Sequence, residues 1–331
     1  MSEKNTLLVV EDLTMEFKSA RRFLEKAKPS VKAVNDVSFE VKEGETFGLV
    51  GESGCGKTTL GKCIVRLLKP AKGKMLFNDN GEMKDLLNLD KKESQAMRKK
   101  LQIVFQDPYA ALNPQHTILE AFDEPMRVHG VGGNKEQRKE LIAKALERVN
   151  LQPDYMYRYP HEFSGGQRQR ICVAKALVLE PKLIVCDEPV SALDVSIQAQ
   201  LLNLMKKLQK ELGVTFIFIA HDLSVVQYMS DRIGVMYLGN MVELADSDEL
   251  YNNTMHPYTK ALLSAVPIPI YNAKKDRIIL EGDVPSPMNP PTGCPFHPRC
   301  TECMDICKQE KPKLVEKKDG HYVACHLFND K

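Results

Sequence analysis

The chain has 331 residues, 43% of them hydrophobic, which is enough for one large or two ordinary domains with buried cores. Its 46 Lys and Arg residues nearly balance 44 Asp and Glu residues, and the resulting net charge of +2 argues against a nucleic-acid partner. The first residues lack the basic-then-apolar layout of a secretory signal, and the apolar stretches, such as residues 215–220, are too short to cross a bilayer. We therefore expect a soluble protein that reaches a membrane only through a partner.

Short β-branched runs alternate with helical patterns over the first 250 residues, which predicts an α/β fold with a mostly parallel sheet. In chain order, we expect a buried strand at 46–50, a helix-rich subdomain at about 91–180 and buried strands at 183–186 and 214–220. Between the last two strands, apolar residues recur at helical spacing from 196 to 212, and Gly213 should end that helix. Residues 232–245, with Gly239 and Asn240 in the middle, predict a hairpin.

The composition changes near Pro267, where a proline-rich stretch begins that excludes long helices and central strands. We therefore divide the chain into a first domain, 1–250, and a Pro- and Cys-rich C-terminal extension, 251–331. Without a secretory signal, crowded cysteines predict metal or cluster ligands rather than disulfides. The crowded cysteines of this extension are Cys294, Cys300, Cys303, Cys307 and Cys325.

Residues 51–58 match the pattern G-x-x-x-x-G-K-[ST] and stand between an expected strand and an expected helix running to about residue 68. Glycines there let backbone N–H groups converge on phosphate oxygens, and the helix N-terminus adds partial positive charge. Lys57 should reach the β- and γ-phosphates, and the Thr58 hydroxyl should bind Mg²⁺. The residues expected to contact the nucleotide are Gly51, Ser53, Gly54, Cys55, Gly56, Lys57, Thr58 and Thr59.

The apolar residues 183–186 lead directly into Asp187 and Glu188. Such a strand is more often structural when it stands alone, but downstream of a phosphate loop the two carboxylates form the natural second half of the site. Asp187 is expected to hold Mg²⁺ through water, and Glu188 to orient or deprotonate the attacking water. Together, the two motifs predict an NTPase of the P-loop class.

A second glycine-containing segment, Phe163 to Gln167, has the sequence F-S-G-G-Q and precedes a helical stretch that ends near residue 179. Ser164 is a good N-cap, and Gly165 and Gly166 leave N–H groups bare at a helix end that favours an anion. Because the phosphate loop holds the chain's own nucleotide, we expect Ser164 to Gln167 to contact the γ-phosphate of ATP bound to another subunit. Here the sequence resembles the ABC transporter ATPase family, whose signature is L-S-G-G-Q.

The resemblance implies roles for further residues. Gln106, in F-Q-D-P, resembles the Q-loop glutamine that contacts Mg²⁺, and Asp194 ends an S-A-L-D segment that resembles the D-loop at the subunit interface. His221 resembles the switch histidine that contacts the γ-phosphate, although a lone histidine is more often a satisfied core or surface residue. Phe17 and Phe23 are the candidates to stack on adenine, and either phenylalanine could equally belong to the core.

The family resemblance implies a cycle in which two subunits close head to tail around two ATP molecules and open after hydrolysis. Since Lys57, Gln106, Asp187, Glu188 and His221 are all present, we expect catalysis on the phosphate-loop side of this chain.

The likeness is strongest to the second, "F-type" ATPase of the oligopeptide and dipeptide importers, through segments 105–114, 256–267 and 284–294. It implies a second ABC ATPase subunit as partner, either a D-type chain or an identical one. It also implies two transmembrane permease subunits, an indirect link to an extracellular or periplasmic peptide-binding protein, and a place on the cytoplasmic face of the membrane. Related members import nickel or other small solutes, so both kinds of cargo stay open.

The spacing of Cys294, Cys300, Cys307 and Cys325 matches four cysteines of the peptide-importer tail, where some members carry a [4Fe–4S] cluster. Cys303 is surplus to that pattern and forms a C-x₂-C pair with Cys300 that suits zinc, with His297 and His326 as further zinc ligands. A structural iron–sulfur cluster, a zinc ion and free thiols are the three alternatives.

Three other functions compete with an importer ATPase. A soluble ABC protein acting on ribosomes or DNA would usually carry two cassettes or a long coiled coil, and this chain has one cassette, no sustained heptads and little net charge. An exporter ATPase would lack the importer-like tail. A regulatory partner that binds ATP without hydrolysing it is disfavoured by the presence of Glu188 and His221.

Overall fold

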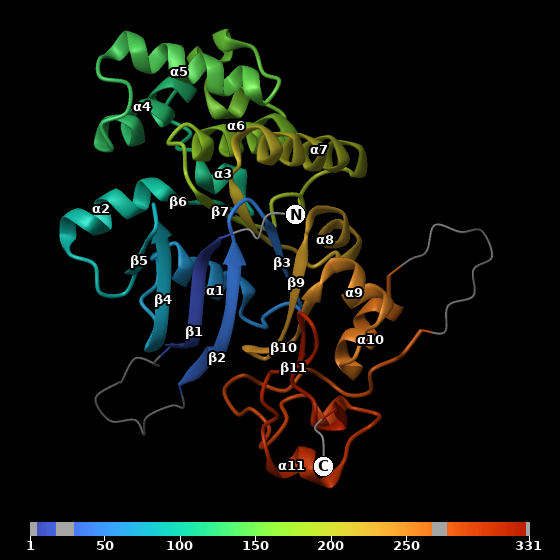
Figure 1. Cartoon of the computed structure of the whole chain (residues 1–331). Coiled ribbons are helices and arrows are strands. Elements are labelled where there is room, and N and C mark those ends of the chain that lie inside the picture. The colour runs from blue at the N-terminus through green and yellow to red at the C-terminus, as the bar shows by residue number, and fades with distance from the viewer. Residues whose placement is uncertain (1–4, 18–29, 267–276, 329–331) are drawn as a thin grey trace, which may run out of the picture.

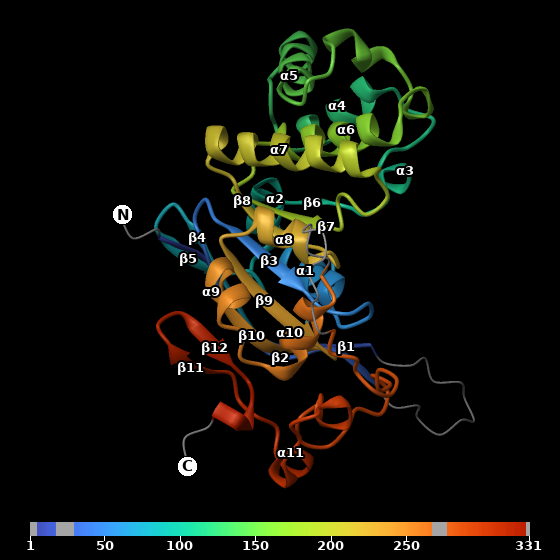
Figure 2. The ribbon, with the colours of Figure 1, turned by 90° about the vertical axis from the view of Figure 1, so that its right-hand side faces the viewer.

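The computed structural model describes residues 5–17, 30–266 and 277–328. Two sheets lie side by side in the lower part of the molecule, and a layer of helices lies beyond one end of them (Figure 1). The same arrangement is visible from the side, with the last part of the chain below the sheets (Figure 2). Among the described residues, no helix has both the length and the apolar character needed to span a membrane.

The smaller sheet has four antiparallel strands, which sequence periodicity did not reveal as a unit. Its order is β2-β1-β4-β5. Buried positions alternate with less buried ones along the second half of β2, whereas β1 has consecutive buried residues; the apolar side chains of both strands share one core with strands of the larger sheet. The strands are β1 (Thr6–Phe17), β2 (Val31–Lys42), β4 (Lys72–Asp79) and β5 (Glu82–Asp85).

The larger sheet has eight strands in the order β11-β12-β10-β9-β3-β8-β7-β6, and its five strands from β9 to β6 run parallel. Its central strands are buried at every position, which is why they read as continuous apolar runs in the sequence. The predicted mostly parallel sheet is therefore confirmed. The strands are β3 (Thr46–Val50), β6 (Leu101–Val104), β7 (Leu183–Asp187), β8 (Thr215–Ile219), β9 (Arg232–Tyr237), β10 (Asn240–Asp246), β11 (Val315–Lys318) and β12 (His321–Val323).

Capping residues set several of the helix ends. Ser164 caps α6 with a capping box, and Gly213, at φ 65°, ends α7 as predicted. Helix α1 ends at Ile64, earlier than the predicted residue 68, and a turn follows it. The α-helices are α1 (Lys57–Ile64), α2 (Lys91–Lys100), α3 (Pro108–Ala111), α4 (Ile118–Val128), α5 (Lys135–Arg148), α6 (Gly165–Leu177), α7 (Val195–Leu212), α8 (Leu223–Met229), α9 (Ser247–Asn252), α10 (Pro257–Ser264) and α11 (Asp305–Gln309). Short 3₁₀ turns are η1 (Pro153–Tyr157), η2 (Pro160–Glu162), η3 (His297–Arg299) and η4 (His326–Phe328).

The helix-rich subdomain predicted at 91–180 contains one strand that was not predicted. Strand β6 lies inside this range and pairs with β7 at the end of the main sheet, so the stretch without strands begins only at α3. The polar composition around β6 concealed a short strand that is only half buried. The predicted hairpin is β9–β10, but its turn is at Leu238 and Gly239, both with positive φ, rather than at Gly239 and Asn240.

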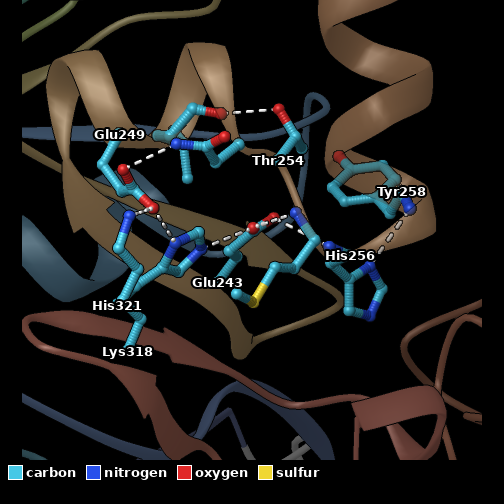
Figure 3. Close-up of polar contacts among 10 residues, drawn as sticks. Glu243, Glu249, Thr254, His256, Tyr258, Lys318 and His321 are labelled. Atoms are coloured by element: carbon cyan, nitrogen blue, oxygen red, sulfur yellow. Dashed lines mark hydrogen bonds and ion pairs between the residues drawn. The ribbon is translucent and has the colours of Figure 1, made fainter.

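The C-terminal region joins the main sheet through β12, which pairs with β10. The fully buried His321 of β12 has its Nε2 2.9 Å from Glu243 Oε1 on β10 and its Nδ1 3.5 Å from Glu249 Oε1 on α9 (Figure 3). Glu243 also accepts backbone hydrogen bonds from Met255 and His256, at 2.7 and 3.2 Å. One buried carboxylate thus connects β10, the start of α10 and the terminal hairpin.

Candidate nucleotide site

The phosphate loop, residues 51–58, connects β3 to α1 in a conformation that requires glycine. Gly51, Gly54 and Gly56 have φ values of 148°, 79° and 103°. A β-carbon on Gly56 would lie 2.0 Å from the Ala33 carbonyl oxygen, and one on Gly51 would lie 2.2 Å from that of Met236. Backbone carbonyls of two other segments therefore lie too close to Gly51 and Gly56 for either residue to carry a side chain.

Lys57, at the start of α1, is buried without a carboxylate partner. Its Nζ donates to the carbonyl oxygens of Gly51 and Glu52, at 2.7 and 3.0 Å, and lies 3.5 Å from Cys55 Sγ. Among the described residues, no Asp or Glu lies within ion-pair distance of this amine. A buried ammonium held only by neutral acceptors favours an anionic ligand, so the loop fits a triphosphate.

Two of the three predicted magnesium ligands, Thr58 and Asp187, lie next to each other. The Thr58 hydroxyl donates to Asp187 Oδ1 at 2.7 Å, which joins the first turn of α1 to the end of β7. Burial raises the pKa of Asp187, and the hydrogen bond from Thr58 only partly offsets this effect. A hydroxyl and a buried carboxylate are oxygen ligands of the kind that Mg²⁺ prefers, so this donor set fits the predicted metal.

The predicted catalytic residues converge beside this pair. Gln106 Nε2 donates to Glu188 Oε2 at 2.9 Å, and His221 Nδ1 lies 3.4 Å from the same oxygen. Glu188 itself has a positive φ of 47°, an unfavourable conformation for a glutamate, and its carbonyl oxygen accepts from the Ser191 hydroxyl at 3.1 Å. The side chains of Gln106 and His221 thus meet at the Glu188 carboxylate, and the catalytic roles expected of all three residues stay predictions.

The segment from Ser164 to Gln167 lies apart from the phosphate loop, although its Gly165 lines a cavity with Gln106, Glu188 and His221. The Ser164 hydroxyl accepts from Gln167 N at 3.3 Å, and Gln167 Oε1 accepts from Ser164 N at 3.0 Å. In both ribbon views, α6 belongs to the helical layer, away from α1 (Figures 1 and 2). Within the described parts of the chain, no hydrogen bond or ion pair joins this segment to the phosphate loop. This end of α6 therefore cannot complete the chain's own loop in this conformation.

Comparison with known proteins identifies the family. Residues 34–191 match the family model described as "ABC transporter", and residues 242–307 match the one described as "Oligopeptide/dipeptide transporter, C-terminal region". The oligopeptide transport ATP-binding protein AppF of Bacillus subtilis is 50% identical over 99% of this chain and 99% of its own length. The oligopeptide transport ATP-binding protein OppF of Haemophilus influenzae is 49% identical over 98% of each chain. The chain belongs to the ABC transporter ATPases of the oligopeptide/dipeptide type.

Solved structures agree with this membership. The dimeric ATP-binding cassette MJ0796, in a post-hydrolysis state with ADP and Pi, is 28% identical and superposes with a TM-score of 0.62 over 73% of this chain and 99% of its own. CbiO1 of Clostridium perfringens, described as part of an ABC transporter complex, is 26% identical with a TM-score of 0.63 over 76% of this chain and 92% of its own. The predicted ABC ATPase fold is confirmed.

The remaining predicted nucleotide contacts of this ABC ATPase are at the surface. Asp194 is the exposed N-cap residue of α7, although its side chain makes no capping hydrogen bond. Thr59 is half-buried in the first turn of α1. Phe17 ends β1 with 44% of its surface exposed, which leaves a ring face open for stacking, whereas Phe23 lies outside the described residues. The roles of all four positions stay predictions.

The predicted cysteine ligands of the ABC ATPase lie close together but do not form a metal site. Burial raises the pKa of Cys294 to about 11 and that of Cys325 to about 12, and thiolates among Cys294, Cys300 and Cys307 add to both shifts. Nevertheless, across residues 5–17, 30–266 and 277–328, no group of three or more His, Cys, Asp or Glu side chains could hold a metal ion. None of the described cysteines forms a disulfide, and neither the [4Fe–4S] cluster nor zinc gains support from this structure.

Sequence reasoning missed two groups of contacts around the site. Tyr109, two residues after Asp107, receives the guanidinium of Arg168 over its ring at 3.9 Å, which joins the segment after Gln106 to α6. Tyr109 and Gln169 line a cavity of about 510 Å³ together with Glu188 and His221. The second group is a contact between the phosphate loop and the C-terminal region, through Glu52 and Arg299. Neither group has a sequence signature, because each joins segments that are far apart in the chain.

Proposed function

We propose that this ABC ATPase powers the import of di- or oligopeptides by binding and hydrolysing ATP. The observation that carries the proposal is the convergence of Gln106, Glu188 and His221 beside the Thr58–Asp187 pair, at the end of a phosphate loop whose lysine has no carboxylate partner. The relatives named for oligopeptide transport, which match the chain almost from end to end, supply the substrate class.

The residues have distinct roles in this proposal. The loop residues Gly51 and Ser53 to Thr59 bind the phosphates, with Lys57 facing the β- and γ-phosphates. Mg²⁺, held by Thr58 and Asp187 with Gln106 beside it, would neutralise charge on the phosphate oxygens. Glu188 orients and accepts the proton of the attacking water, and His221 holds the Glu188 carboxylate and faces the γ-phosphate.

The signature segment acts on a second subunit. Because Ser164, Gly165, Gly166 and Gln167 lie away from the chain's own loop, we propose that they cap the γ-phosphate held by a partner ATPase, with Asp194 at the shared interface. The partner is a D-type chain or a second copy. The dimeric MJ0796 cassette supports a two-subunit assembly. Through two permease subunits the pair would lie on the cytoplasmic face of the membrane and respond indirectly to a peptide-binding protein.

The test is purification of the intact membrane complex with its binding protein. Subunits are identified by mass spectrometry, and ATPase activity is measured with dipeptides, oligopeptides or Ni²⁺. Stimulation by peptides supports the proposal. Stimulation only by nickel or another small solute moves the motor to a different cargo, and no permease in the complex would overturn the transport role.

The [4Fe–4S] cluster remains a separate proposal about the C-terminal thiols, with zinc as its alternative. It is supported only by the sequence spacing of Cys294, Cys300, Cys307 and Cys325. Protein purified without oxygen should be brown and absorb near ~400 nm if the cluster is present. A colourless protein with stoichiometric zinc, or with no metal, would contradict it.

A further inference from the structure

Glu52, the second residue of the phosphate loop, is held at three points. Its carbonyl oxygen accepts from Lys57 Nζ at 3.0 Å, and its N–H donates to Tyr258 Oη at 2.9 Å. Its carboxylate forms a two-pronged ion pair with Arg299, with Nη1 2.8 Å from Oε2 and Nη2 3.3 Å from Oε1. Two of these three contacts come from the C-terminal region.

The Arg299 side of this contact is rigid. Arg299 ends the turn η3, directly before Cys300, and its side chain is only 9% exposed. The preceding Phe296 packs against Tyr237 and Tyr258, with ring centroids 5.3 and 5.4 Å apart. Tyr237 and Tyr258 are themselves in edge contact at 4.7 Å. The guanidinium and the Tyr258 hydroxyl are therefore aimed at Glu52 by one buried aromatic cluster.

The charge of Glu52 is out of place in a loop that binds a polyanion. A carboxylate so near the phosphates repels them, and in a partly buried setting that repulsion is poorly screened. The same carboxylate belongs to the residue whose carbonyl already binds Lys57, so without another partner it could pair with the lysine meant for the phosphates. A bidentate arginine, always charged, removes both difficulties.

We propose that Arg299 is a positioning residue of the nucleotide site, which neutralises Glu52 and keeps its carboxylate away from Lys57. The inference rests on the proposed binding of ATP at residues 51–58. The C-terminal region is then part of the nucleotide site, because Arg299 in the turn η3 neutralises the charge of Glu52 in the phosphate loop of the same chain.

The test is titration of the full chain with a fluorescent ATP analogue, mant-ATP, and Mg²⁺. Arg299→Met keeps the aliphatic stem and removes the charge, so its Kd should rise about tenfold. Arg299→Lys should stay within about threefold of wild type, because it keeps the charge. Should the methionine variant lack the wild-type circular dichroism spectrum, Arg299→Gln replaces it.

The decisive variant is the double one. If Arg299 acts through charge, Arg299→Met/Glu52→Gln should return to within about threefold of the wild-type Kd, since no carboxylate remains to be neutralised. If Arg299 only ties the tail to the loop, the double variant will bind as weakly as Arg299→Met, which would overturn the proposal. A wild-type Kd for Arg299→Met would overturn it equally.

Two controls separate this proposal from the proposed function. Arg138→Ala removes another arginine–carboxylate pair, with Asp123 at 2.6 Å in the helical layer, and should leave the Kd unchanged. Lys57→Ala should abolish binding. If wild type itself does not bind mant-ATP, the nucleotide site is wrong. If it binds and loses affinity with Lys57→Ala, but is indifferent to Arg299, only the inference about Arg299 fails.

Discussion

The phosphate-loop side and the signature segment differ in how many of their partners lie on the same chain. At the loop, Thr58 and Glu188 each contact groups from other segments of this chain, up to 129 residues away for the Thr58–Asp187 pair. At the signature, the side chains of Ser164 and Gln167 bond to each other's backbone N–H groups, and Arg168 N donates to the Ser164 carbonyl oxygen at 2.9 Å, so these contacts all lie within one helix start. One side is assembled by folding, and the other is left as an exposed helix end.

This difference determines whether each side can be studied in the isolated chain or only in the assembled complex. Nucleotide binding by the loop depends on contacts present in the isolated chain, so it can be studied there. The contribution of the signature depends on what a second subunit brings to it, so it is measurable only in an assembled complex. The four predictions below test this division, beginning with the largest effect.

Glu188→Gln should remove most of the ATP hydrolysis at the loop side and leave the structure of that side intact. Glutamine keeps the contact with Gln106 but cannot accept a proton, so ATP turnover by the complex should fall at least ~100-fold while ATP still binds. Phosphate release measures turnover, and filter binding measures occupancy. Near-normal turnover would remove Glu188 from the role of base.

Gly56→Ala should disrupt the backbone conformation of the phosphate loop. The new β-carbon would meet the Ala33 carbonyl oxygen at 2.0 Å, and the residue has a φ of 103°, so we expect a loss of about 2–3 kcal/mol in the free energy of unfolding. Gly213→Ala is the matched control, since it also has positive φ but nothing within 4 Å of the new carbon. Its cost should be about 1 kcal/mol. Equal losses in urea unfolding would show that the close approach of backbone to Gly56 is unimportant.

Ser164→Ala should impair the signature segment and leave nucleotide binding at the loop side unchanged. Turnover by the assembled complex should fall about tenfold with loss of the capping hydroxyl. The Kd of the isolated chain for mant-ATP should not change, because Ser164 lies away from that chain's loop. A weaker Kd in the isolated chain would mean that the signature serves its own nucleotide.

The smallest of the four effects is expected for His321→Gln. This variant tests how strongly the terminal hairpin β11–β12 is held to β10. Burial disfavours the charged ring, but Glu243 and Glu249 outweigh it and raise the pKa of His321 above 6.5. The stability contributed by the protonated ring is therefore complete below pH 6.5 and lost as the pH rises through the folded-state value.

Thermal melts at a series of pH values measure this contribution. Wild type should lose about 2 °C more than His321→Gln between pH 6 and pH 8.5. His116→Gln, in the segment before α4, is the control and should follow wild type. Parallel curves for wild type and His321→Gln would contradict a charged His321.

The sequence allowed the main sheet and the Asp187–Glu188 strand end to be located because both depend on local patterns. Gln106 and His221, in contrast, were assigned only through the family resemblance, and the roles of all four residues stay predictions. Strands such as β7 are continuous apolar runs, and Asp187 and Glu188 follow directly from their position at a strand end. The antiparallel sheet, strand β6 and the ion pair between Glu52 and Arg299 were not predictable in the same way. They depend on pairings between distant segments, which periodicity within a single window does not register.

The pairing of β12 with β10 has a practical consequence for anyone who shortens this chain. A fragment ending before β11 would leave the backbone of β10 as an unpaired sheet edge and Glu243 without the buried histidine beside it. Open edges of this kind recruit other strands, so such a fragment should self-associate even if its nucleotide loop is intact. The hairpin β11–β12 thus gives this side of the sheet a short, charged edge strand, and its removal would expose the longer, more buried β10 as the edge instead.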